Sequence, residues 1–134
     1  MVNLKFRAYL KERPYLKGTG IIVDVQEINY KYEEIIYESG KYKEVADFKD
    51  VELLQSTRLF DLDGNEIYIG DILKMEDEYT QVVFHEDNST YGVYLEDKEG
   101  GGNPISDYST RISLNHIKGT IKGNQFQHPH LLEE

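Results

Sequence analysis

The sequence predicts an all-β (mainly β) protein, in which an N-terminal β-rich portion packs on a small SH3-like barrel. Apolar and polar side chains alternate at residues 2–9, as in a strand with one buried face. After residue 66, short β-branched and aromatic runs recur between Asp, Asn and Gly residues that favour turns. Roughly five short strands in about sixty residues suggest closure into a barrel, which removes exposed strand edges.

The same pattern divides the chain into segments. We predict a β-rich region at residues 1–58, the barrel at 59–125 and an extended tail at 126–134, with one compact unit as the alternative. A chain of 134 residues buries roughly two thirds of its unfolded surface, which is enough for a hydrophobic core without disulfides or a metal ion. Cys is absent, so no disulfide contributes.

In the first region, residues 2–9 and the β-branched run at 21–25 are the first two expected strands, separated by a Pro- and Gly-containing loop. A hairpin is expected around the turn at residues 38–41. Tyr30, Tyr32 and Tyr42 are expected to pack across these strands. Residues 46–54 fit a short helix and a strand about equally, and we expect a short turn or strand there.

The central hairpin depends on Asp63, Gly64 and Asn65, since Gly and Asn readily adopt the positive φ of a tight reversal. Gly70 and Asp71 then form a structural corner before the next strand. Residues 61–65 also look like a calcium loop. However, the glycine is fourth rather than sixth, and Ile72 occupies the twelfth place, where an EF-hand needs Glu.

The remaining strands should alternate with loops. Successive glycines in the tract 99–104 are costly to order, so a mobile surface loop is expected there. A phosphate-binding loop would need a following helix and a closing Lys, which the residues after Pro104 do not supply. The strands are expected at 69–75, 80–86, 91–97, 109–114 and 117–122.

The stretch LQSTRLFDLDGNEIYIGDIL at residues 54–73 resembles the central motif of the YopX family of phage and prophage proteins. KFRAY at residues 5–9 is similar to the start of the family pattern, and GTI at 119–121 and HPHLL at 128–132 are similar to its end. The resemblance implies a shared fold and an uncharacterised protein with no assigned activity.

Two positions in the central motif differ from the family pattern. Ser56 stands where the family usually has Tyr, and Arg58 where it usually has Gly. If that glycine takes a positive φ, Arg58 must adopt the same angle at a cost, or the loop must differ locally.

Charge and composition exclude several classes of protein. The net charge of -10, with 25 acidic against 15 basic residues, disfavours nucleic-acid binding, which needs a basic surface. The N-terminal segment has no long apolar stretch, so neither a signal peptide nor a membrane span is expected, and we predict a cytoplasmic protein.

No catalytic or metal-binding pattern is present in the sequence. His128 and His130 flank a proline and would form only a flexible chelate, with no Cys to complete a structural zinc site. Nothing resembles a nucleophile elbow or a triad. We therefore predict no enzyme activity, no catalytic residues, no metal and no cofactor.

Tyrosine is the most suggestive residue type, with eleven in the chain. A ring with a polar tip suits both interfaces and half-exposed sheets, and SH3-like barrels bind extended peptides in aromatic grooves. Packing across strands is the alternative role. The candidate binding residues are Tyr68, Tyr79, Tyr91, Tyr94 and Tyr108.

These observations favour a non-enzymatic protein–protein interaction module with an unidentified protein partner. Self-association through Tyr-rich strands or an unpaired edge is a further expectation. One alternative is an acidic antagonist, a DNA mimic that presents carboxylates to a host nucleic-acid-binding protein. Another is a weak nucleic-acid-binding SH3-like domain, which would require a contiguous basic face.

Overall fold

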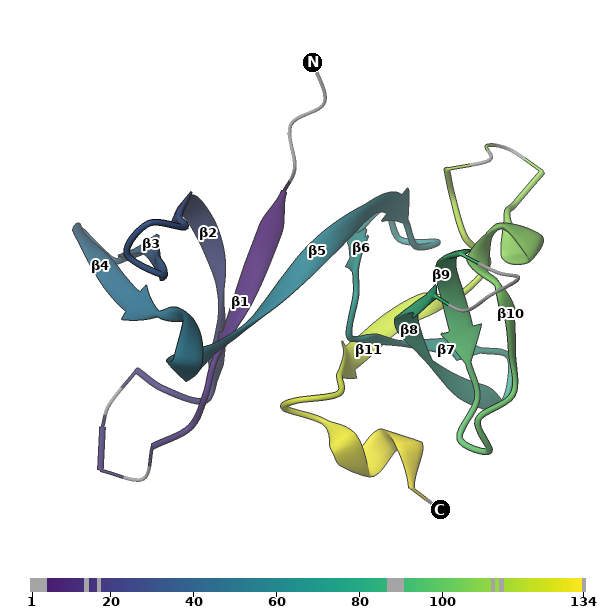
Figure 1. Ribbon diagram of the computed structural model, residues 1–134. Coiled ribbons are helices and arrows are strands. Elements are labelled where there is room, and N and C mark those ends of the chain that lie inside the picture. Colours follow the sequence, from purple (N-terminus) through teal and green to yellow (C-terminus); the bar gives the residue numbers. More distant parts are fainter. Residues whose placement is uncertain are drawn as a thin grey trace. The chain divides into compact units, whose positions relative to one another are not determined.

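The computed structural model describes residues 5–13, 15–16, 18–86, 91–111, 113 and 115–133. In this part of the chain, antiparallel strands dominate and the helical segments are short 3-10 turns, which confirms the predicted fold class (Figure 1). The chain forms two compact units, Met1–Gln55 and Ser56–Glu134. Their boundary lies inside one strand, β5 (Val51–Phe60), slightly before the boundary predicted after residue 58.

The first unit is an antiparallel sheet in the order β4-β3-β2-β1, continued by the first part of β5. Ala8, Leu10, Ile35 and Val51 form its buried core. The turn η1 (Phe48–Asp50) separates β4 from β5, so residues 46–54 form a short turn and a strand. The other strands are β1 (Phe6–Leu10), β2 (Ile21–Asn29), β3 (Glu34–Ser39) and β4 (Tyr42–Asp47).

The second unit contains a five-stranded antiparallel sheet in the order β10-β9-β8-β7-β11. The end of β5 pairs with the short strand β6 (Glu66–Tyr68). Six buried apolar residues form the core: Ile67, Leu73, Val82, Leu95, Ile105 and Ile117. The sheet strands are β7 (Asp71–Met75), β8 (Glu78–Glu86), β9 (Tyr91–Glu96), β10 (Gly102–Pro104) and β11 (Thr120–Asn124).

The second sheet does not close into the predicted SH3-like barrel, because β10 and β11 end its order of pairing. Pro104 has no N–H to extend the ladder, and the chain turns there into η2 (Ile105–Tyr108), which buries Ile105 in the core. Instead of the strand expected at 109–114, the described residues make an isolated bridge between Ser109 and Ile117.

Part of the glycine tract forms a strand where a loop was expected. Its last glycine, Gly102, belongs to β10 and pairs with Glu96 on β9. A Cβ added to Gly102 would lie 2.5 Å from the carbonyl oxygen of Leu95. Glycine at this position therefore allows the two backbones to approach each other.

The C-terminal segment is not an extended tail. It turns into η3 (Pro129–Leu132), which lies against β8. Asn124 begins the reversal, since its Oδ1 accepts the backbone N–H groups of Phe126 and Gln127 at 3.0 and 2.8 Å. His128 then packs over Gly123, where an added Cβ would lie 2.5 Å from the imidazole Nδ1.

The buried carboxylate of Asp61 organises the central turn. Its Oδ1 accepts the backbone N–H groups of Asp63 at 2.9 Å and Asn65 at 2.8 Å. Its Oδ2 accepts the N–H of Ile121 on β11 at 2.9 Å. Gly64 has a φ of +85° and donates its N–H to the Asp61 carbonyl at 3.0 Å. One side chain thus holds the turn and joins it to a strand far away in sequence.

The same turn recurs at residues 97–101. The Oδ1 of Asp97 accepts the N–H groups of Glu99 at 2.9 Å and Gly101 at 3.0 Å. Gly100 has a φ of +88° and donates to the Asp97 carbonyl at 3.0 Å. Among the described residues, the bonds of the Asp97 carboxylate stay within its own turn, whereas Asp61 also binds another strand.

Gly70 and Asp71 form the corner between β6 and β7. Gly70 has a φ of +98°, a conformation that favours glycine. The Oδ2 of Asp71 accepts the backbone N–H of Tyr68 at 2.8 Å. The Gly70 N–H donates to the Val82 carbonyl at 2.8 Å. These bonds give both residues a structural role at the corner.

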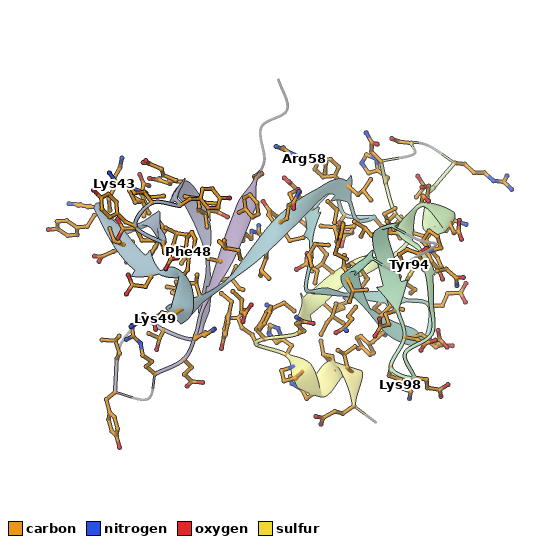
Figure 2. The ribbon with its side chains drawn as sticks, in the orientation of Figure 1. Lys43, Phe48, Lys49, Arg58, Tyr94 and Lys98 are labelled. Carbon is orange, nitrogen blue, oxygen red and sulfur yellow. The ribbon has the colours of Figure 1, made fainter. Side chains whose placement is uncertain are left out.

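Arg58, labelled in Figure 2, adopts a φ of +61° in β5, so it takes the angle that the family glycine would favour. The pairing of β5 with β6 shifts register between Ser56 and Leu59. The Ser56 hydroxyl accepts the Arg58 N–H at 2.9 Å and donates to the Glu66 carboxylate. A positive φ costs a non-glycine residue about 1–2 kcal/mol.

We predict that Asp61→Asn destabilises the second unit much more than Asp97→Asn. An asparagine oxygen can replace the Oδ1 that accepts two bonds in either turn, but its NH2 group cannot accept from Ile121. The cost should be about 2–3 kcal/mol for Asp61→Asn and below about 1 kcal/mol for Asp97→Asn. Urea unfolding followed by circular dichroism measures both, and equal losses would contradict the assigned role of Asp61.

We also predict that Arg58→Gly is more stable than Arg58→Ala by about 1 kcal/mol. Both variants lose the guanidinium, but only glycine removes the strain at positive φ. Thermal unfolding of the two variants, compared with the wild-type protein, separates the cost of backbone strain from the loss of the guanidinium. A higher melting temperature for the alanine variant would show that position 58 is not strained.

Candidate functional site

A shallow cleft of about 200 Å³ lies in the second unit. The turn between β7 and β8, the turn after β9 and the η3 segment form its walls. Its lining residues are Asp77, Glu78, Tyr79, Asp97, Lys98, Glu99, Leu131, Leu132 and Glu133.

Local backbone structure positions each wall. Glu76 takes a φ of +56° and reverses the chain, so that Met75 pairs with Glu78. The Asp97 turn presents Lys98 and Glu99, and Figure 2 labels Lys98 on this turn. The packing of η3 against β8 supplies the third wall. The cleft therefore depends on two tight turns and the folded C-terminal segment.

The cleft has a mainly polar and acidic lining that includes one aromatic and two aliphatic side chains. Tyr79, Leu131 and Leu132 are partly buried, and the Lys74 Nζ lies 5.8 Å from the centre of the Tyr79 ring. Carboxylates predominate on the rim, with Lys98 as the basic lining residue. Such a surface suits an apolar side chain flanked by Lys or Arg, because aromatic and aliphatic groups supply contact area and carboxylates select cations.

Within the described residues, no group of three or more His, Cys, Asp or Glu side chains is arranged to hold a metal ion. The paired histidines near the C-terminus illustrate this. The rings of His128 and His130 lie 6.2 Å apart, edge to face, and the His128 Nδ1 accepts the N–H of Asn124 at 3.2 Å. His128 thus has a structural contact within the C-terminal turn.

The structure does not bring the five candidate tyrosines together. Tyr79 lies in the cleft. Tyr68 is 1% exposed, so the interpretation of Tyr68 as a binding residue is corrected, since it packs in the interior. Tyr108 packs against the core and its hydroxyl accepts from Asn103 at 3.1 Å. Tyr94 is partly exposed on β9, and the side chain of Tyr91 lies outside the described residues.

Sequence reasoning missed the exposed aromatic side chains of the first unit. Tyr30, Tyr32 and Tyr42 are 70%, 63% and 72% exposed, rather than packed across strands as expected. Tyr30 makes an edge contact with Phe48 at 5.9 Å between ring centres. The positions of all three explain the exposure, because Tyr30 and Tyr32 lie within the turn at residues 30–33. Tyr42 begins the outermost strand, β4.

Comparisons with known proteins agree with this fold and assign no activity. The family model described as YopX protein matches residues 5–133. The protein is thus a two-unit, all-β member of the YopX family, which confirms the resemblance. The crystal structure of protein EF1440 from Enterococcus faecalis is similar, with a TM-score of 0.59 and 20% identity over 99% of this chain and 100% of that chain. This likeness shows a shared fold.

No curated protein matches the chain. In the ranges that the structure describes, none of the helical segments has the length and apolar character needed to cross a membrane.

Proposed function

We propose that this YopX-family protein is a non-enzymatic interaction module of phage or prophage type, whose second unit binds a partner protein. The observation that carries the proposal is the cleft, in which Tyr79, Leu131 and Leu132 lie among carboxylates. A partner segment with an apolar side chain beside Lys or Arg has the complementary chemistry.

The size of the cleft supports a protein partner over a small substrate. Its volume of about 200 Å³ is below the roughly 300–1,000 Å³ of typical small-molecule sites. It has room for one or two side chains. A protein partner would obtain further contact area from the surrounding surface, as interfaces with a small central anchor do.

The same carboxylates support a second candidate function, an acidic antagonist of a nucleic-acid-binding protein. Five acidic residues from two turns and the C-terminal segment gather at the cleft, and the whole chain carries a charge of -10. The two candidates differ in their partner. The antagonist would bind the nucleic-acid-binding surface of its target and compete with DNA or RNA there.

We predict that Tyr79→Ala and Glu99→Lys each reduce partner capture from host cells at least severalfold. The first removes the aromatic anchor, and the second reverses an exposed rim charge without touching the backbone bond of Glu99. Affinity capture with identification by mass spectrometry measures the effect. Tyr30→Ala is the control, since Tyr30 is an exposed tyrosine of the first unit, and should retain the partner. Loss of the partner only in Tyr30→Ala would contradict the cleft and indicate a binding site in the first unit.

We further predict that random-sequence duplex DNA binds weakly or not at all near physiological salt. Phosphate binding needs clustered Lys or Arg whose contacts release counterions, and the cleft is predominantly acidic. A fluorescence anisotropy titration at several salt concentrations checks this. Tight and steeply salt-dependent binding would contradict both candidate functions.

A further inference from the structure

Strand β4 forms one end of the pairing order of the first unit. Its six residues, YKEVAD, include no Pro or Gly, and its pairing with β3 has no register shift. Natural proteins protect an edge strand by shortening it, bending it, inserting Pro or placing charged side chains on it. β4 has none of the first three devices, but it carries Lys43, Glu44 and Asp47. These charges restrict which strand, and which register, can pair with it.

The other sheet ends in the described residues are protected. β10 has three residues and includes Pro104, and β6 also has three residues. β11 has a register shift between Ile121 and Gly123. The N–H of Ile121 already donates to Asp61 at 2.9 Å. β4 is therefore the edge best suited to pairing with another strand.

The backbone pattern shows which groups of β4 face outward. Phe48, just after β4, donates its N–H to the Glu33 carbonyl at 2.8 Å. Because successive residues of an antiparallel pair alternate between bonding to and away from the partner strand, the even-numbered residues of β4 bond to β3. The N–H and C=O groups of Lys43, Val45 and Asp47 point away from β3.

We propose that β4 pairs with β4 of a second copy of this chain, antiparallel and about a two-fold axis at Val45. Val45 then lies opposite the partner's Val45, and Lys43 lies opposite the partner's Asp47. By symmetry, Asp47 lies opposite the partner's Lys43. The interface joins the first units of two copies into one continuous sheet and does not depend on the function proposed for the cleft.

Symmetry and charge select this register. A two-fold axis perpendicular to a sheet keeps each side chain on its own face, so the central residue lies opposite itself. A centre at Lys43 would oppose two ammonium groups, and a centre at Glu44 would oppose two carboxylates, which is destabilising. Glu44 also directs its backbone groups toward β3. Val45, 55% exposed, has neither disadvantage.

The monomer contains a like-charge pair that a second copy would relieve. Glu34 on β3 lies directly opposite Asp47 on β4, and like charges in this position are unfavourable. In the dimer, the partner's Lys43 lies on the other side of Asp47. Figure 2 labels Lys43 on this strand. Five described residues, Lys11, Arg13, Leu16, Gly18 and Thr19, line a hollow of about 410 Å³ together with Val45 and Asp47.

Sedimentation equilibrium of the full chain over micromolar to low-millimolar concentrations tests the proposal. The wild-type protein should form dimers. Lys43→Asp places two carboxylates opposite each other at both symmetric positions, and Asp47→Lys places two ammonium groups there. Each should raise the dimer dissociation constant about tenfold or more. Both side chains are exposed, and Asp47 makes no capping bond. Lys43→Asp also places a carboxylate opposite Glu38 on β3, so circular dichroism must first show that each variant keeps its fold.

An equimolar mixture of the two variants tests the register itself. In the mixed dimer, each altered residue faces a residue of opposite charge, so the wild-type affinity should return. Lys31→Asp, a matched charge reversal in the turn between β2 and β3, should dimerise like the wild-type protein. A wild-type monomer at every concentration would overturn the proposal. So would a dimer that both variants leave unchanged, or variants that do not associate when mixed.

Discussion

The second unit depends on one buried carboxylate. Asp61 is fully buried, and a charge taken out of water is tolerated only when hydrogen bonds replace its hydration. Three backbone N–H groups do so here, two in the central turn and one on β11. This arrangement explains why an acidic, glycine-containing loop that superficially resembles a calcium site is a structural turn. The carboxylate oxygens of Asp61 accept N–H groups of the turn itself and of β11.

The second unit contains two turns of this type, and they have different structural roles. Asp61 and Asp97 hold their loops with matching bonds, and Gly64 and Gly100 take similar positive φ values. The Asp61 turn is tied to the sheet through Ile121. The Asp97 turn instead forms a wall of the cleft. A single turn chemistry thus serves the core in one place and the candidate binding surface in the other.

Each surface proposed for binding carries groups that the fold leaves partly exposed: side chains in the cleft and backbone N–H and C=O groups on β4. In the second unit this is the cleft with Tyr79, and in the first unit it is the edge of β4. The second sheet stays open because Pro104 cannot extend the hydrogen-bond ladder, and because Ile105 is more stable in the core than on a sheet edge.

The sequence alone determined the all-β class and the reversals at Gly64 and Gly70, because these follow from alternation and from positive φ over a few residues. The YopX family was evident from the resemblance of the motif at residues 54–73. The tertiary structure decided which tyrosines are exposed, since the burial of Tyr68 and the position of Tyr79 beside Leu131 depend on distant segments. It also decided the role of Asp61, whose third bond reaches a residue sixty positions away. Local sequence patterns specify the backbone conformation of a short segment. Packing between distant segments specifies which side chains are buried, and so which remain exposed for binding.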